Sequence, residues 1–389
     1  MLELAFLLLP IAAAYGWYMG RNSVKQNDQS AKEALSKKFS TGINFLLSNQ
    51  QDKAIDYLIE ALKVDDDTVE AHFAMANLFR KRGELDRALR VHEHLVHQKH
   101  LPSKEKQKAV FELGKDFLSA GLYDRAEDMF TRLLKTKVYG LKSLTFLFQI
   151  YQSTSDWKEG IAMEKLVVKH NDAKLLHILA NFYCEKATKA LAEKNYIDVV
   201  ELLEKSLSFD PNSCRTNWLL AKVYEDQEQY AEACRCYNEI YQQDSEFFPD
   251  VIENMHQCYL KLDAEKEFYL FLRKAYEETG STSLLIKYVD NIERKNGNKK
   301  AQDYMLTALN RRPTIGGFKR FVKLQASEET DPVNSEGIDM IKGLITSYMK
   351  MKPRYSCRTC GFNSSTHYWS CPSCHGWEQL KPVRGLEGE

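Results

Sequence analysis

The sequence lacks several features that would direct its function toward catalysis or nucleic-acid binding. Lysine plus arginine and aspartate plus glutamate both number 54 in the 389 residues, so no excess of either charge favours nucleic acid as a partner. No phosphate-binding glycine loop, nucleophile elbow or HExxH motif is present. Five of the nine cysteines are scattered, which fits a reducing compartment better than a disulfide framework. These absences predict a binding protein that is not an enzyme and has no catalytic residues.

Long stretches without charge are also scarce, and the N-terminus holds the most informative one, Leu4–Gly20. As a helix, these 17 residues would span about 25 Å, the short end of what crosses a bilayer core. Glu3 precedes the run and Arg21 follows it, whereas a cleaved signal peptide carries positive charge in front. We expect a retained transmembrane anchor at residues 1–20, with the N-terminus outside, the bulk of the chain in the cytoplasm, and a polar tether at residues 21–34. A cleaved signal peptide or a buried core helix is the alternative.

A period of about 34 residues follows the tether. Small residues recur at successive separations of 34, 38, 34, 39 and 34. The members of this column are Ala54, Ala88, Ala126, Gly160, Val199 and Ala233, and Ala301 continues it 68 residues later. Small side chains allow two helices to approach closely. The pattern resembles the tetratricopeptide-repeat family and predicts an all-α superhelical solenoid of about eight units over residues 35–313.

The period is lost after Pro313, and residues 314–352 read as a linker followed by a capping helix. The acidic stretch Gln325–Gly337 predicts a loop. Ile338–Met351 carries apolar residues on one helical face and is expected to cover the open end of the last repeat.

Two Cys-x2-Cys pairs near the C-terminus predict a metal site. Cys357 and Cys360 form one pair, and Cys371 and Cys374 form the other. Four thiolates make a tetrahedral site for zinc or iron. A module this small has too little core to fold alone, so metal binding must supply much of its folding free energy.

The module, residues 353–382, resembles a rubredoxin-type pair of knuckles. Gly361 tolerates the positive φ that the turn after a knuckle needs. His375 stands where the second knuckle usually has glycine, and the spacer between the knuckles is short for an electron-carrying rubredoxin. Both departures favour a structural site with zinc, with iron as the alternative. We expect the module to pack on the last repeats and to be covered by its own aromatic residues, Tyr355, Phe362, Tyr368, Trp369 and Trp377.

The inner groove of such a solenoid is the expected partner-binding surface. First-helix residues outside the small and aromatic columns should point into it: Phe73, Asn77, Arg80, Lys81, Phe111, Lys115, Trp218 and Lys222. The alternative is an ordinary solvated surface. The histidine-rich run that begins at His92 lacks metalloprotease spacing, and His92 falls in a core column, so it is predicted to be a packed core residue.

The set of anchor, repeats and knuckles resembles the lipopolysaccharide assembly protein B family of Gram-negative bacteria over essentially the full length. The matching stretches are MLELAFLLLPIAAAYGWYMGR, PRYSCRTCGF, YWSCPSCHGW and KPVRGLEG. The resemblance implies an inner-membrane adaptor. It would act with the membrane protease FtsH to degrade the deacetylase that commits precursors to lipid A, engage other inner-membrane assembly proteins, and possess the capacity to form homo-oligomers. A membrane-tethered rubredoxin-like electron carrier and a general scaffold for cell-envelope enzymes are the competing hypotheses.

Overall fold

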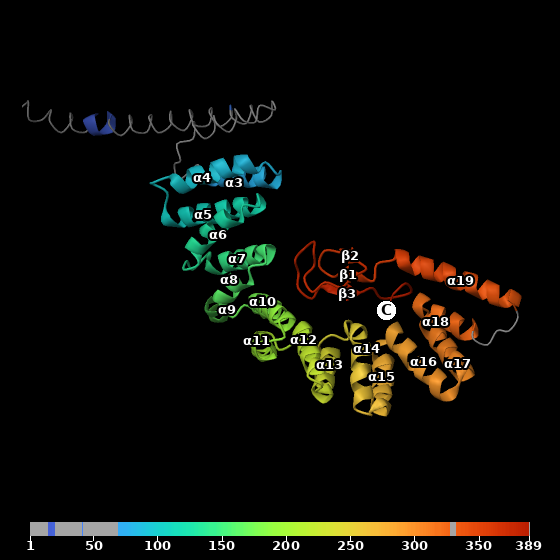
Figure 1. Cartoon of the computed structure of the whole chain (residues 1–389). Coiled ribbons are helices and arrows are strands. Elements are labelled where there is room, and N and C mark those ends of the chain that lie inside the picture. The colour runs from blue at the N-terminus through green and yellow to red at the C-terminus, as the bar shows by residue number, and fades with distance from the viewer. Residues whose placement is uncertain (1–14, 20–40, 42–68, 327–331, 389) are drawn as a thin grey trace, which may run out of the picture. The chain divides into compact units, whose positions relative to one another are not determined.

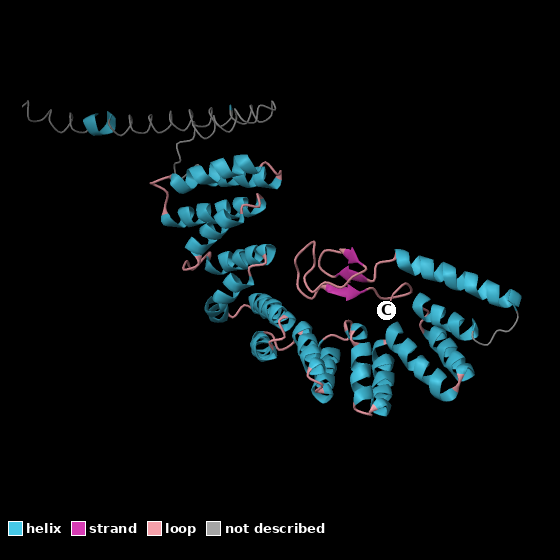
Figure 2. Cartoon of the chain, viewed as in Figure 1, coloured by secondary structure: helices cyan, strands magenta, loops and turns pink. Residues whose placement is uncertain are grey.

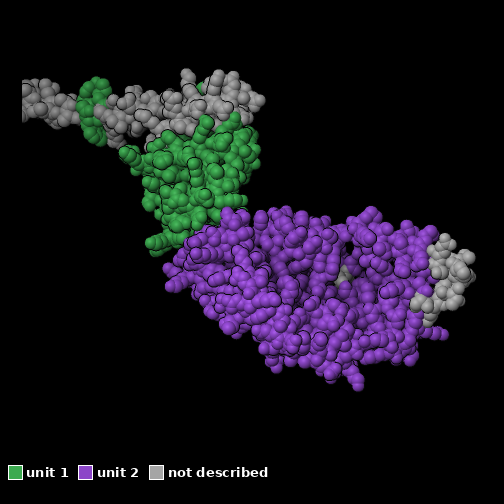
Figure 3. Space-filling view, viewed as in Figure 1, with its two compact units in different colours: residues 1–150 green, residues 151–389 purple. Residues whose placement is uncertain are grey.

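The structure, a computed structural model, describes residues 15–19, 41, 69–326 and 332–388. It divides into two compact units, residues 1–150 and 151–389, coloured green and purple in Figure 3. Most of the predicted anchor and all of the predicted tether lie outside the described residues. Over the described ranges, no helix is both long and apolar enough to cross a membrane.

The helices described between residues 69 and 150 of unit 1 pack as antiparallel neighbours along the chain (Figure 1). The described helices are α3 (Val69–Lys81), α4 (Leu85–His97), α5 (Ser103–Ser119), α6 (Tyr123–Leu133) and the first part of α7 (Gly140–Thr154). Gly83 and Gly121 lie in turns between these helices and have positive φ values, of 80° and 73°, which only glycine adopts without strain.

Unit 2 continues the helical pairs and ends in a small sheet (Figure 2). Its helices are α8 (Trp157–Ala162), α9 (Glu164–His170), α10 (Ala173–Ala192), α11 (Tyr196–Phe209), α12 (Cys214–Asp226), α13 (Tyr230–Gln243), the 3-10 helix η1 (Phe248–Asp250), α14 (Ile252–Lys261), α15 (Glu265–Thr279), α16 (Thr282–Asn296), α17 (Asn298–Arg311), α18 (Ile315–Ala326) and α19 (Pro332–Met351). Several helix starts are capped as the sequence dictates, since the side chains of Asp172, Ser213 and Ser281 each accept a backbone N–H three residues on.

The predicted column of small residues is confirmed wherever the structure describes it. Ala88, Ala126, Gly160, Val199, Ala233 and Ala301 are all buried. Gly160 shows why size matters, because a Cβ atom there would lie 2.3 Å from the ring of Phe182. Close approach of the paired helices therefore depends on the absence of a side chain at this position.

The region after the repeats differs from the prediction. A further helix, α18, occupies residues 315–326, where a linker was expected, and it packs on α16, α17 and α19. Helix α19 begins at Pro332, so the predicted loop over residues 325–337 is wrong for residues 332–337. Proline is favourable at the first helical position because an N–H group there has no intrahelical partner, so its absence in proline costs no hydrogen bond.

The C-terminal module adds three short antiparallel strands to an otherwise helical chain. They are β1 (Tyr355–Cys357), β2 (Asn363–Ser364) and β3 (Leu380–Pro382), in the order β2-β1-β3. Tyr355 pairs with Ser364 on one side and with Pro382 on the other. The described chain is thus a mostly helical repeat array with a small strand-containing module at its end.

Candidate metal centre and its seat on the repeats

The two knuckles fold in the same way. The N–H of Gly361 donates to the carbonyl of Cys357 at 2.9 Å, and the N–H of His375 donates to the carbonyl of Cys371 at 2.9 Å. Both residues after the knuckles have positive φ, 76° for Gly361 and 57° for His375. Histidine therefore adopts the turn that glycine usually supplies, at the cost of a left-handed backbone.

The four cysteine sulfur atoms converge on one point. All four Sγ atoms lie within 4.8 Å of one another. The Sγ atoms of Cys357 and Cys374 are 3.7 Å apart, as are those of Cys360 and Cys371. A tetrahedral ion with metal–sulfur bonds of about 2.3 Å requires separations of about 3.8 Å. The residues present therefore fit one zinc or iron ion, and four sulfurs leave no coordination position for a substrate.

Backbone N–H groups favour the thiolate form that a metal requires. The pKa of Cys360 is lowered to about 7, first by the backbone N–H of Phe362 and also by hydrogen bonds with the neighbouring cysteines. A thiolate is the species that binds the ion, so this backbone donor prepares the site for metal. When bound, the ion supplies a crosslink between the two knuckles.

The core of the module is smaller than predicted. Tyr355 and Leu380 are buried against the ligand cysteines, and Phe362 packs beside them. The expected aromatic cover is wrong for the other three rings. Tyr368 is 43% exposed, and Trp369 and Trp377 pack against rings of the repeats.

These two tryptophans seat the module on the repeats of unit 2. The ring of Trp369 lies 5.3 Å from that of Trp218 on α12 and 4.9 Å from that of Phe247. Trp377 is 4% exposed and packs 6.1 Å from Trp157 of α8. The predicted packing on the last repeats is therefore wrong for the module body, which contacts the middle of the array, from Gln152 of α7 to Asp250 of η1.

Arg215 on α12 joins the two tryptophans, and the sequence analysis missed it. Its guanidinium lies 5.2 Å from the ring centre of Trp377 and 5.8 Å from that of Trp369. The side chain is nearly buried and forms an ion pair with Glu185 at 2.7 Å. A cation desolvated between two indole rings contributes about 2 kcal/mol per favourable ring contact.

A group of ion pairs also joins the module to the repeats. Acidic residues of the segment between α13 and α14 pair with basic residues of the module. The pairs are Lys381–Asp244, Arg358–Glu246, Arg384–Glu246 and Arg354–Asp250. Tyr355 also donates its hydroxyl hydrogen to Asp250 at 2.9 Å. The acidic segment at residues 244–250, DSEFFPD, and the basic residues of the module are both visible in the sequence. Their separation along the chain, more than 100 residues, does not predict that they are in contact.

A buried polar cluster completes the contact. Glu378 of the module accepts a hydrogen bond from Ser213 Oγ at 3.1 Å, and burial raises its pKa. His177 Nδ1 lies 2.6 Å from Asp210. Burial alone would lower the pKa of His177, but the bond to Asp210 and the nearby Glu378 charge outweigh it, so the pKa is raised.

The predicted groove residues have different surroundings in the two units. Trp218 faces the module's Trp369, and the Nζ of Lys222 lies 3.5 Å from the ring centre of Trp218. In unit 1, Phe73 and Phe111 are 1% and 7% exposed. Both rings are buried within the repeats. Phe73 packs against Val69, Leu95 and neighbouring residues, and Phe111 packs against the rings of Tyr139, Phe130 and Phe146.

The polar groove residues of unit 1 surround a buried ion-pair network. Arg80 Nη1 donates to Asp116 Oδ1 at 2.7 Å, and the fully buried His92 Nδ1 lies 2.5 Å from the other oxygen of Asp116. Lys115 pairs with Glu112 at 2.9 Å, and Arg80 also pairs with Glu112. His92 is thus a core residue, as predicted. Partner binding by Asn77, Arg80, Lys81 and Lys115 stays a prediction.

Fold and site together define a class of protein, a tetratricopeptide-repeat scaffold with a rubredoxin-type metal module. Residues 71–105 match the family model described as tetratricopeptide repeat, and residues 355–382 match the one described as rubredoxin metal binding domain. A tetratricopeptide repeat protein from Parabacteroides merdae has 13% identity and a TM-score of 0.35, covering 72% of this chain and 99% of that chain.

Curated relatives identify the family within this class. Lipopolysaccharide assembly protein B of Escherichia coli strain K12 is 40% identical over 388 residues, covering 100% of both chains. The protein of the same name from Haemophilus influenzae is 33% identical over 395 residues, again covering 100% of both. The chain belongs to the lipopolysaccharide assembly protein B family.

Proposed function

We propose that this chain is an inner-membrane adaptor in lipopolysaccharide assembly that binds proteins and performs no chemistry itself. Family membership over the full length carries the proposal. The repeat fold supports it, because repeat solenoids present extended surfaces for protein binding. Among the described residues, the four-cysteine centre is the one cluster able to hold a metal, and its sulfurs fill the coordination sphere.

The finer mechanism is that the adaptor brings the deacetylase that commits precursors to lipid A to the protease FtsH. An anchor at residues 1–20 would hold the repeats near the membrane and raise their effective concentration toward a membrane protease. Other inner-membrane assembly proteins would bind in the same way. Deleting residues 1–20 should leave a folded chain without regulatory activity, and full activity of that variant would refute the need for an anchor.

The partner surface in this proposal is the polar face of unit 1. Aromatic side chains of the module cover the inner face of α8 to α12, so Trp218 and Lys222 serve the module's seat. Lys81 is exposed and Asn77 and Lys115 are half-buried on the first helices of unit 1. Charged residues at a partly exposed surface act mainly by steering and selecting partners.

Site-specific photocrosslinking tests this surface. A photoreactive residue replaces Lys81 or Lys115 in the full chain, and captured proteins are identified from intact membranes. FtsH and the deacetylase should be captured from these positions and not from the control position Arg132, which is exposed on α6. Equal capture from Arg132, or capture of neither protein, would contradict the proposed surface.

Electron transfer is the competing function, and the exposure of Cys360 at the metal centre favours it. An iron-loaded site would absorb visible light and bleach reversibly on reduction. Purification from cells with balanced zinc and iron should yield colourless, zinc-containing protein. Stoichiometric iron with reversible reduction would instead support the carrier function.

A further inference from the structure

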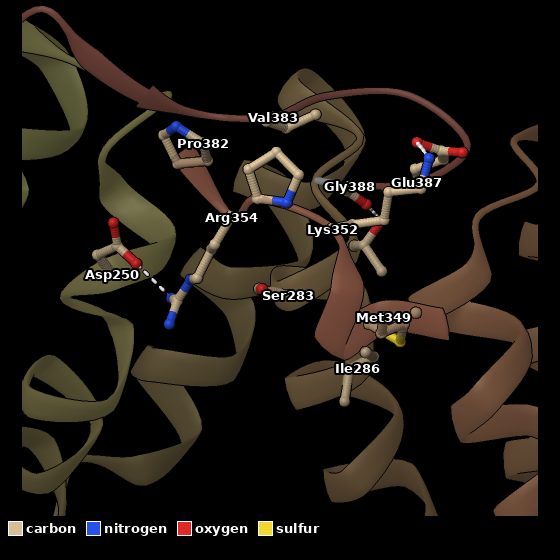
Figure 4. A pocket seen from close by; sticks show the side chains of 13 residues that line it. Asp250, Ser283, Ile286, Met349, Lys352, Arg354, Pro382, Val383, Glu387 and Gly388 are labelled. Carbon is tan, nitrogen blue, oxygen red and sulfur yellow. Dashed lines mark hydrogen bonds and ion pairs between the residues drawn. The ribbon is translucent and has the colours of Figure 1, made fainter. Parts of the chain in front are cut away.

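A cavity of about 280 Å³ lies where the last repeats, α19 and the chain's C-terminal segment meet (Figure 4). Its apolar wall includes Ile286 of α16, Met349 of α19 and Val383 of the C-terminal segment. Its polar side includes Lys352 and Arg354. A space of this size accommodates one or two apolar side chains and is small for a cofactor.

The C-terminal segment is bound beside this cavity mainly by residues outside the module. The backbone N–H of Ile315 donates to the carbonyl of Leu386 at 2.8 Å. Glu387 forms an ion pair with Lys352 at 3.0 Å and accepts a hydrogen bond from the hydroxyl of Tyr348. The repeats and α19 thus bind this acidic segment through its backbone and its carboxylate, as they would bind a separate peptide.

The segment is a tight turn that depends on two glycines. Gly388 donates its N–H to the carbonyl of Gly385 at 3.2 Å, and Gly385 has φ of 105°. A Cβ atom at Gly388 would lie 1.8 Å from the carbonyl oxygen of Val383, so a side chain there would expel the turn. Leu386 within the turn is 59% exposed and contributes little apolar burial.

We propose that this cavity and the seat of the turn form a binding site for a short acidic turn segment of a partner protein. The chain's own turn, residues 385–388, occupies the site when the partner is absent. Lys352, which pairs with Glu387 in the structure, matches an acidic ligand, while Arg354 stays paired with Asp250 of the cavity wall. The cavity offers room for an apolar side chain beside it. The shallow burial of Leu386 makes the internal segment displaceable. The inference rests on the proposed adaptor function and assigns one of its partner sites.

Peptide binding to the purified full chain in detergent tests the site. The probe is a fluorescein-labelled peptide, VRGLEGE, measured by fluorescence anisotropy. A chain shortened by residues 385–389 should bind it saturably, and the full chain at least tenfold more weakly because its own turn competes. Absence of saturable binding to the shortened chain, or equal binding by both chains, would overturn the proposal.

Point variants separate the seat from non-specific effects. Gly388→Ala keeps the full length and should bind the probe like the shortened chain, whereas Gly343→Ala, at a helical position with open space, should bind like the full chain. Lys352→Ala in the shortened chain should weaken binding of the probe about tenfold. Replacing the first glutamate of the probe by alanine should have an effect of the same size. Unchanged affinity in both would overturn the acidic-ligand assignment. Client capture at Lys81 reports on the adaptor function separately.

Discussion

The inner faces of the two units are built from the same helical repeat and are completed in different ways. In unit 1, Arg80 and His92 share the buried carboxylate of Asp116, so the charges of the repeats satisfy one another. In unit 2, the face of α8 to α12 presents Trp157 and Trp218, and these rings are covered by the tryptophans of the metal module.

The difference shows that a repeat surface is not a binding surface by default. A polar face such as that of unit 1, whose charges are paired among themselves, is stable in contact with water and can bind and release partner proteins. An aromatic face of the second kind needs a permanent cover, because a large exposed apolar patch favours aggregation. In this chain the cover is a module whose fold depends on metal, so the two faces should respond differently to damage.

Loss of a metal ligand should have the largest effect. Cys371→Ser removes a fully buried sulfur, so the chain should lose its ion, and with it about 10 kcal/mol or more of metal-dependent folding free energy. The module should then leave its seat and expose Trp157 and Trp218. Metal analysis and a red shift of tryptophan fluorescence measure this, and regulation of lipopolysaccharide synthesis should be abolished.

Cys236→Ser is the matched control, because Cys236 is a buried cysteine outside the centre. It should retain the ion in full. Retained regulation in a metal-free Cys371→Ser chain would show that the module's seat is dispensable.

Breaking the network of unit 1 should destabilise that unit and leave the module seated. Asp116→Asn removes the buried carboxylate that Arg80 and His92 share, while Arg80 keeps its pair with Glu112, so the cost should be about 1–3 kcal/mol. Hydrogen exchange of α3 to α5 should rise while the metal content stays unchanged. Asp128→Asn, which breaks an exposed pair with Arg132, should cost less than about 1 kcal/mol. Metal loss in the Asp116 variant would contradict the independence of the two faces.

Acid should weaken the seat of the module through His367. Burial lowers the pKa of this histidine to about 4, and the charge of Lys381 acts in the same direction. In the unfolded chain its pKa is near 6.5, so on acidification the unfolded state binds the proton first and native stability falls. Between pH 7 and pH 5 the loss should be about 2 kcal/mol.

Denaturant unfolding of metal-loaded protein at both pH values measures this loss. Proton competition for the cysteine ligands affects every variant equally, so His367→Gln should reduce the pH dependence by about 2 kcal/mol. An unchanged pH dependence in that variant would exclude His367 as the responsible group.

The smallest effect concerns the second knuckle. His375 has φ of 57°, so His375→Gly should stabilise the chain by about 1 kcal/mol while leaving metal binding intact. Gly361→Ala is the reciprocal control, since φ is 76° and no atom lies within 4 Å of the added Cβ, and it should destabilise by a similar amount. Thermal unfolding of both variants checks the sign, and destabilisation by His375→Gly would contradict backbone strain at this turn.

Regular spacing made much of this molecule predictable from its sequence. The small-residue column follows from the repeat period of about 34 residues, the paired knuckles follow from the Cys-x2-Cys spacing, and both are confirmed. The degree of burial of Phe73 and Phe111 did not follow, because whether a first-helix ring faces the groove or the neighbouring repeat depends on the packing angle between helices. The helix over residues 315–326 also lacked the repeat signature.

The seat of the module required information that spacing does not carry. Gln152 donates hydrogen bonds to Ser370 and to the carbonyl of His375, contacts that span 218 and 223 residues. Arg215 could not be distinguished from an ordinary surface arginine until both tryptophans were placed. Complementary charge between residues 244–250 and the module is compatible with this contact but does not identify it, because many other charged segments of the chain are equally complementary.

The contact between Gln152 and the last knuckle has a consequence for synthesis of the protein on the ribosome. A repeat array usually folds progressively, since each unit needs only its neighbours. Here the repeats that carry Trp157 and Trp218 emerge about 150–220 residues before the tryptophans that cover them, a delay of roughly 10–40 s at ordinary elongation rates of about 5–20 residues per second. A nascent chain that stops early, or meets no metal, would present an uncovered aromatic face to chaperones and proteases, so only complete and metal-loaded copies would persist.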